Sequence, residues 1–258
     1  MKNLIEENLI PYLKEKFPPS MIKKSKTLKI TGLGESSVNE LIRDYINKKT
    51  NFSFGIYANP EDIQVQITTQ APTEKETDKL LQYSVNQLKK ILGNYVYGTD
   101  KQSLEEVVGN LLKNKKIKVA VAESCTGGML GEMITRIPGS SKYFQGGVIS
   151  YASIVKEDLL KVLPEVIKKY GEVSEQVARL MAEGVRINCH SNIGISITGI
   201  AGPGGATEKK KVGLVYMALA DGEKTITKKH QLFGSRQLIR LRSVRRALNM
   251  LRMYLMEK

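Results

Sequence analysis

The sequence has few of the residues that build metal sites and disulfide frameworks. It contains only two cysteines, Cys125 and Cys189, and two histidines, His190 and His230. Two cysteines outside any CxxC pair exclude a disulfide framework and disfavour a zinc site of the usual Cys and His kind. We therefore expect no metal and no cofactor. A Ser–His mechanism would have to use one of only two histidines.

A long apolar run is also missing. No stretch of about 18 apolar residues is present, and the first residues lack the apolar core of a signal peptide. The hydrophobic content of 41% and the charged content of 26% are those of a globular protein in water. We expect no membrane contact and a cytoplasmic location.

Positive charge is abundant and unevenly spread. The net charge is +14, and residues 101–258 hold 26 of the 40 Lys and Arg residues but 14 of the 26 Asp and Glu residues. Residues 1–100 have a net charge of only +2. This balance favours an anionic partner, either nucleic acid or a phosphorylated small molecule, although a solvated basic face explains it equally well.

The apolar pattern divides the chain into three parts. Residues 1–20 form a linker segment, with an amphipathic stretch at 3–17 that ends at Pro18 and Pro19. Residues 21–98 predict a small α+β domain, because strand patterns and helix patterns alternate along them. The strands are predicted at 28–30, 63–67 and 95–97, and the helices at 35–47 and 77–92.

Residues 99–258 predict a layered α/β/α domain. The near-continuous apolar segments 118–122 and 193–198 are typical of strands buried in a parallel sheet, and helical patterns alternate with strand patterns. The other strands are predicted at 147–151, 212–219 and 224–232. The helices are predicted at 103–113, 129–135, after a Ser153 cap to 163, after a Ser174 cap to 185, and at 235–256.

Ser124 directly follows the first buried strand. Ligands of layered α/β domains sit at the carboxyl ends of strands, where loops meet helix N-termini, so we expect unpaired N–H groups around this hydroxyl. The arrangement suits a nucleophile with an oxyanion hole, and Gly127 and Gly128 would let a substrate approach the backbone. The alternative is that Ser124 only caps the next helix. Cys125 is a rival nucleophile, whose side chain we expect to point away from Ser124.

Three further segments lie at strand ends or helix starts. Lys156 is predicted in the first turn of a helix after a strand ending at Tyr151, where the helix dipole and partial burial lower a lysine pKa and allow it to accept a serine proton. A solvated surface lysine is the alternative. The Gly-rich loop 199–205 suits a phosphate or a sugar, or is a tight turn without ligand. Arg236 at the start of the last helix suits a phosphate or carboxylate, whereas the later arginines form a solvated face or a subunit or polyanion contact.

Seven short motifs occur in a fixed order in this second part. They are AESCTGG at 122–128, PGSS at 138–141, GVISY at 147–151, GEVSE at 171–175, ITGIAGP at 197–203, VG at 212–213 and GSR at 234–236. In order and spacing they resemble the C-terminal domain of the CinA family, the nicotinamide mononucleotide (NMN) deamidases. Residues 1–98 resemble the end of that family's first domain followed by its KH-like middle domain.

The resemblance implies that the chain hydrolyses the carboxamide of NMN to nicotinate mononucleotide and ammonia, without a metal. It implies that Ser124 is the nucleophile and Lys156 the base, and that Tyr151 and Thr198 assist them. Arg236 would help to hold the substrate. The complete set of candidate substrate-binding residues is Arg236, Thr126, Gly127, Gly128, Gly199 and Gly202.

The chain departs from the family pattern in three respects. Ser153 stands where the family often has Asn, and Lys211 where it usually has Pro. Full-length members carry a further N-terminal domain, which resembles molybdopterin-binding proteins and is associated with ADP-ribose pyrophosphatase activity. This sequence opens near the end of that domain, so we expect a truncated or naturally shortened form without that activity.

Two alternatives remain for the function. One is a nucleic-acid-binding accessory protein associated with competence for DNA uptake, without catalysis. The nearly neutral charge of the KH-like part disfavours nucleic-acid binding. The TGLG sequence at 31–34 matches the GXXG loop only loosely. The other is an inactive regulatory domain. We further expect a homo-oligomer.

Overall fold

The computed structural model describes residues 5–16 and 20–258, which fall into two compact units. The first unit comprises Met1–Ala58 and Asp62–Asp100, and the second comprises Asn59–Glu61 and Lys101–Lys258. Within the segment 1–20, the described residues form the helical pieces Ile5–Leu9 (η1) and Ile10–Lys16 (α2). Pro18 and Pro19, where an end to this segment was predicted, lie outside the described residues.

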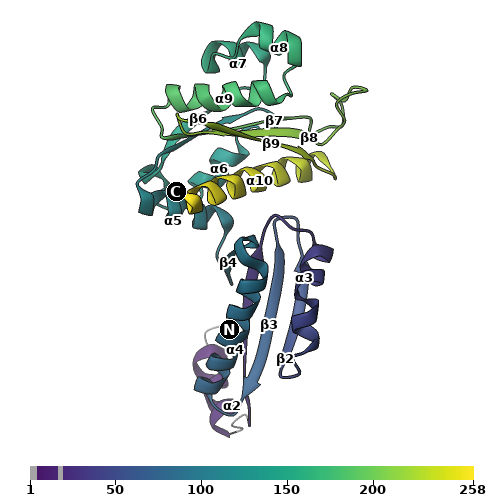
Figure 1. The fold of residues 1–258 in the computed structure, drawn as a ribbon. Coiled ribbons are helices and arrows are strands. Elements are labelled where there is room, and N and C mark those ends of the chain that lie inside the picture. The colour runs from purple at the N-terminus through teal and green to yellow at the C-terminus, as the bar shows by residue number, and fades with distance from the viewer. Residues whose placement is uncertain (1–4, 17–19) are drawn as a thin grey trace. The chain divides into compact units, whose positions relative to one another are not determined.

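The first unit is an antiparallel sheet with two helices on one face (Figure 1). The strands lie in the order β2-β3-β1-β4, and helices α3 and α4 pack against each other and against the strands. Its elements are β1 (Ile22–Ile30), α3 (Glu35–Asn47), β2 (Phe52–Ala58), β3 (Ile63–Ala71), α4 (Glu74–Leu92), η2 (Gly93–Tyr95) and β4 (Val96–Thr99).

Period-two alternation explains the core of this unit. Ile63, Val65 and Ile67 of β3 are buried beneath the helices, whereas the glutamines between them are partly exposed. Helix α3 has the predicted bounds, because its apolar positions recur at helical spacing and place Val38 and Ile42 in the core. The other predicted strands and helices of this part are present with longer or shifted bounds. Strand β2 was not predicted.

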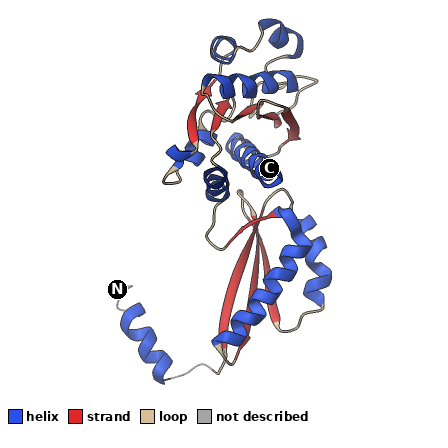
Figure 2. Ribbon diagram, turned by 60° about the vertical axis from the view of Figure 1, so that its left-hand side comes forward, coloured by secondary structure: helices blue, strands red, loops and turns tan. Residues whose placement is uncertain are grey.

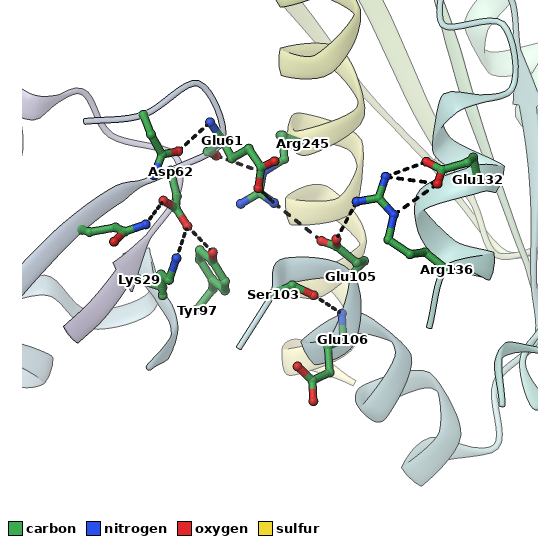
Figure 3. A network of polar contacts seen from close by, with 12 residues as sticks. Lys29, Glu61, Asp62, Tyr97, Ser103, Glu105, Glu106, Glu132, Arg136 and Arg245 are labelled. Atoms are coloured by element: carbon green, nitrogen blue, oxygen red, sulfur yellow. Dashed lines mark hydrogen bonds and ion pairs between the residues drawn. The ribbon is translucent and has the colours of Figure 1, made fainter. Parts of the chain in front are cut away.

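A buried carboxylate joins strands of the first unit (Figure 3). Asp62 accepts a hydrogen bond of 2.5 Å from the Tyr97 hydroxyl and one of 3.3 Å from Lys29 Nζ. A third comes from the Gln64 amide at 3.0 Å. A buried carboxylate is costly unless it is paired, so these three hydrogen bonds are needed to keep Asp62 buried in this fold.

The second unit is a three-layer α/β/α domain, as predicted. Helix α9, with α7 and α8 beyond it, covers one face of the sheet, and α5, α6 and α10 cover the other (Figures 1 and 2). In chain order, the unit begins with α5 (Leu104–Lys115), β5 (Val119–Glu123), α6 (Met129–Thr135), η3 (Ser140–Lys142), β6 (Phe144–Ile149), α7 (Ser153–Leu160) and α8 (Pro164–Tyr170). They are followed by α9 (Glu175–Asn188), β7 (Ile193–Gly199), β8 (Leu214–Ala220), β9 (Thr225–Gln231) and α10 (Arg236–Glu257).

The sheet of the second unit has the strand order β6-β5-β7-β8-β9. Strands β6, β5 and β7 are parallel, and β8 and β9 continue the sheet in antiparallel pairs. The carboxyl ends of β5, β6, β7 and β9 therefore lie at one edge of the sheet. Loops from this edge are where ligands bind in such folds.

Packing on both faces explains why β5 and β7 are buried and mostly apolar. All five residues of β5 are buried. On one face, Val177, Met181 and Val185 of α9 pack against Ala120 and Ala122 of β5. On the other face, α10 packs against α5, and Arg245 and Glu105, each about 5% exposed, form an ion pair of 3.6 Å between these helices (Figure 3).

The bounds near the predicted base differ from the prediction. Strand β6 ends at Ile149 and not at Tyr151, so Ser150 and Tyr151 belong to the loop that follows. Ser153 is the first residue of α7 and not its cap, and its hydroxyl bonds to another side chain. The predicted helix to 163 ends at Leu160, and a separate helix α8 begins at Pro164, which was not predicted. The Ser174 cap of α9 is confirmed by its bond from the Val177 N–H.

The described residues form neither a membrane-spanning helix nor a metal-binding cluster. No helix among residues 5–16 and 20–258 is long and apolar enough to cross a membrane. Within the same residues, no group of three or more His, Cys, Asp and Glu side chains lies close enough to hold a metal ion.

Candidate active site

A cleft of about 760 Å³ opens at the edge of the second unit's sheet where β5, β6 and β7 end. Five of the residues singled out from the sequence line it, namely Ser124, Tyr151, Gly199, Gly202 and Arg236. The others, Lys156, Thr198, Thr126, Gly127 and Gly128, lie behind or beside this wall and do not line it.

Ser124 is held at the end of β5. Its backbone N–H donates to the carbonyl of Ile197 in β7 at 3.0 Å, so the pairing of the two strands extends to the serine. The residue is 8% exposed. In the part of the chain that the structure describes, the Ser124 hydroxyl has no hydrogen-bond partner, so it is available to a molecule in the cleft.

The donors beside Ser124 are not those that the sequence predicted. The N–H groups at the start of α6 were expected to be unpaired, but the buried Glu123 carboxylate accepts hydrogen bonds from Gly128, Leu130 and Gly131, at 3.1, 3.0 and 2.8 Å. By contrast, no acceptor in another residue is found among the described residues for the N–H groups of Cys125 and Thr126, which follow the serine. The Cys125 N–H contacts its own sulfur, and its residue lines the cleft, whereas Thr126 is fully buried. The Cys125 N–H is therefore the candidate donor for an oxyanion hole.

The turn after Ser124 depends on two glycines and an arginine. Gly127 and Gly128 have φ angles of +58° and +93°, which side-chain-bearing residues rarely adopt. A Cβ atom on Gly128 would lie 3.0 Å from Ile149 Cδ1. Arg240 of α10 donates a hydrogen bond of 2.6 Å to the Thr126 carbonyl and so ties the turn to α10. The glycines shape the loop that carries the serine.

Lys156 is buried behind the cleft, with its side chain 0% exposed. Its Nζ donates to the carbonyl oxygens of Ser150 and Tyr151, at 2.8 and 3.1 Å. Burial lowers the pKa of Lys156, and Glu172, whose carboxylate lies 3.6 Å from Nζ, opposes that change. A neutral amine has two N–H bonds, which two carbonyls satisfy, and keeps a lone pair that can accept a proton.

The lysine and the serine are not in contact in this structure. Among the described residues, no hydrogen bond joins Lys156 Nζ to Ser124 Oγ. Cys125, the neighbour of Ser124, is close enough that its thiolate form would raise the pKa of Lys156. Catalytic hydrogen bonds are commonly long in the absence of substrate, so this geometry is compatible with a serine–lysine pair.

Cys125 is a poor nucleophile in this setting. Its residue is 6% exposed, although it belongs to the cleft wall. Burial is the main cause that raises the pKa of its thiol to about 11. A cysteine reacts through its thiolate, so at neutral pH Ser124 is the stronger candidate.

Thr198 does not reach toward the serine or the lysine. The residue is fully buried, and its hydroxyl donates a hydrogen bond of 2.9 Å to the backbone carbonyl of Glu172. Its contact with the candidate base is therefore indirect, through the Glu172 segment. The Ser153 hydroxyl bonds to the carboxylate of the same glutamate.

Arg236 connects two parts of the cleft wall. Its guanidinium donates to the Gly202 carbonyl at 2.6 Å and to the Tyr151 hydroxyl at 3.2 Å. Tyr151 also lines the cleft and is 59% exposed, so the hydroxyl that accepts this bond lies on an accessible side chain. The wall has a small net positive charge, because three basic side chains, Lys209, Lys210 and Arg236, line it together with two glutamates, Glu172 and Glu208.

Several residues of the site were not found from the sequence. Glu123 had a detectable signal, because a carboxylate at the end of a fully buried strand needs partners. Glu172, Lys210 and Arg240 had none, because each acts on a segment that is distant in the chain.

Comparisons with known proteins agree on one family. The CinA C-terminal domain matches residues 101–255, and the damage-inducible protein CinA KH domain matches residues 25–98. Competence-damage inducible proteins of Caldicellulosiruptor bescii and Clostridium novyi are 43% and 42% identical over 98% and 100% of this chain. The chain spans 61% and 62% of the length of these two relatives.

Solved structures show the same similarity. The competence/damage inducible protein CihA from Agrobacterium tumefaciens is 35% identical, with a TM-score of 0.56 over 60% of this chain and 96% of its own. A CinA superfamily protein from Klebsiella pneumoniae is 26% identical, with a TM-score of 0.59 over 61% of this chain and 100% of its own.

Proposed function

The chain belongs to the CinA family, and on that premise we propose that its second unit hydrolyses the carboxamide of NMN to nicotinate mononucleotide and ammonia. The observation that carries the proposal is local. A free serine hydroxyl on a cleft wall lies beside the backbone N–H of Cys125, which has no acceptor in another described residue, with a buried lysine of lowered pKa behind it. Amide hydrolysis needs a nucleophile, an oxyanion hole and a base.

In the first half of the reaction, Ser124 Oγ attacks the carboxamide carbon and the Lys156 amine takes the hydroxyl proton. The N–H group of Cys125, on the cleft wall, stabilises the negative oxygen of the tetrahedral intermediate. As the intermediate collapses, Lys156 returns the proton to the leaving nitrogen and ammonia departs. The product of this half is an ester between Ser124 and the nicotinoyl group.

In the second half, a water molecule attacks this ester and Lys156 accepts its proton. The second tetrahedral intermediate uses the same N–H donor of Cys125. Its collapse returns the proton to Ser124 Oγ and releases the carboxylate product. No step of this sequence needs a metal.

The basic wall of the cleft suits the phosphate of the substrate. Arg236 lies at the N-terminus of α10, where the helix dipole also favours an anion. Its guanidinium is already oriented by Gly202 and Tyr151, which reduces the ordering cost of binding.

An ammonia-release assay tests the proposal. We expect Ser124→Ala to reduce the rate to background and Lys156→Met to reduce it by about a hundredfold to ten-thousandfold, the usual contribution of a general base. Lys168→Met, a change at an exposed lysine of α8, is the matched control and should leave the rate unchanged. Full ammonia release by Ser124→Ala and Lys156→Met would disprove the mechanism, and a folded wild type without release would disprove the activity.

A further inference from the structure

Glu172 occupies the turn between α8 and α9 and faces the candidate base. Its carboxylate lies 3.6 Å from Lys156 Nζ, accepts a hydrogen bond from the Ser153 hydroxyl and lines the cleft. The side chain is 47% exposed, so one side of the carboxylate faces the cleft and the other faces the buried amine.

The backbone on both sides of Glu172 is held in place. Thr198 donates to the Glu172 carbonyl at 2.9 Å. Lys210 Nζ donates to the carbonyls of Tyr170 and Val173, at 2.6 and 2.7 Å, and so spans the turn. These contacts come from two different segments, β7 and the loop after it. Together these contacts hold the backbone from which the Glu172 carboxylate extends.

Burial and charge act on Lys156 in opposite directions. Burial lowers its pKa, whereas Glu172, and after it Cys125 and Tyr151, raise it. Cys125 is a neutral thiol at neutral pH, because burial raises its own pKa to about 11. Glu172 is therefore the main group that favours the ammonium form of Lys156.

We propose that Glu172 is a positioning residue that holds Lys156 Nζ and stabilises the ammonium ion that Lys156 becomes when it takes the serine proton. This inference rests on the proposed function. The same stabilisation makes Lys156 keep its proton to higher pH when no substrate is bound. Glu172 thus speeds the chemical step and at the same time restricts activity in acid.

The decisive variant is Glu172→Gln, which keeps the shape of the side chain and removes its charge. Glu208→Gln removes another carboxylate of the cleft wall that has no contact with Lys156 among the described residues, and is the matched control. Glu172→Asp restores the charge on a shorter side chain. All variants are made in the full chain.

Two readouts separate this inference from the proposed function. The first is a pH titration of the Lys156 side chain by ¹³C NMR of lysine-labelled protein, with the signal assigned by its loss in Lys156→Met. The second is the pH dependence of kcat and KM for ammonia release from NMN. The titration needs no activity, so it remains informative if NMN is not the substrate.

We expect Lys156 to lose its proton at lower pH in Glu172→Gln, at the wild-type pH in Glu208→Gln and at an intermediate pH in Glu172→Asp. The acid limb of kcat should move to lower pH in Glu172→Gln while its plateau falls and KM stays near the wild-type value. An unchanged Lys156 titration in Glu172→Gln would overturn the inference. If Glu172→Gln does not fold, Ser153→Ala should move the titration in the same direction, and no movement there would overturn it equally.

Discussion

The Glu123 carboxylate accepts a hydrogen bond of 2.8 Å from the backbone N–H of Gly131, eight residues further along the chain. With its bonds to Gly128 and Leu130, this acid caps α6 from the residue just before Ser124. These hydrogen bonds tie the start of the loop, at Glu123, to its end at the first turn of α6. The position of the candidate nucleophile therefore depends on the carboxylate of the preceding residue.

We predict that Glu123→Ala lowers the free energy of unfolding by about 1–3 kcal/mol, because one buried and two partly buried N–H groups lose a charged acceptor. Thermal unfolding of the full chain measures the effect. Glu132→Ala on the same helix removes a carboxylate that is 57% exposed and should change stability little. Equal losses in both variants would contradict the assigned cap.

The pH dependence of activity follows from Lys156. Its ammonium form cannot accept a proton, so the rate should fall as pH decreases through its pKa. Burial places that pKa below the ordinary value of 10.5. In the window between the lowered pKa and 10.5, the unfolded chain binds a proton that the folded protein lacks, so this lysine makes stability rise with pH. Chemical denaturation at several pH values should show that this slope is smaller in Lys156→Met.

Cys125 should be almost inert toward alkylation. With a pKa of about 11, only about one thiol in ten thousand is ionised at pH 7. We expect iodoacetamide to modify it about a hundredfold or more slowly than an exposed cysteine of ordinary pKa. Mass spectrometry of Cys189→Ser, which leaves Cys125 alone, measures the rate. Rapid labelling would restore Cys125 as a rival nucleophile, and Cys125→Ala should retain ammonia release if Ser124 is the nucleophile.

Arg236→Lys should weaken substrate binding although it keeps the charge. A lysine cannot bond to Gly202 and Tyr151 while also presenting a fork of N–H groups to a phosphate. We expect the KM for NMN to rise about tenfold, the loss of one charge-assisted hydrogen bond, with a smaller change in kcat. Arg242→Lys is the control, because the Arg242 guanidinium bonds to Phe233 and does not line the cleft. A rise in KM of the same size in the control would contradict the role of Arg236.

The sequence was sufficient where one segment carries the whole signal. Helix α3 was predicted with its observed bounds because its amphipathic period is uninterrupted. Strand β2 was missed because its sequence, FSFGIYA, has no clean alternation and contains a glycine. Helix α8 was missed because the preceding helix was predicted to run to residue 163. The structure ends that helix at Leu160, and Lys161 adopts a left-handed conformation.

The candidate site was predicted in part for the same reason. Ser124 follows a fully buried strand and Lys156 lies in the first turn of a helix after a strand, so local pattern made both positions candidates, and the family resemblance chose them among other polar residues. The partner of Thr198 is a carbonyl that lies 26 residues away, and Glu123 uses donors that were assigned to a ligand. Such relationships depend on tertiary packing, which periodicity does not encode.

The cleft wall is drawn from the end of β5, the loop before α7, the turn before α9, the long loop between β7 and β8, and the first residue of α10. These pieces span more than a hundred positions of the chain, and no two neighbouring ones suffice. Complementary fragments cut anywhere between β5 and α10 would each lack part of the cleft wall, and only their reassociation would complete it.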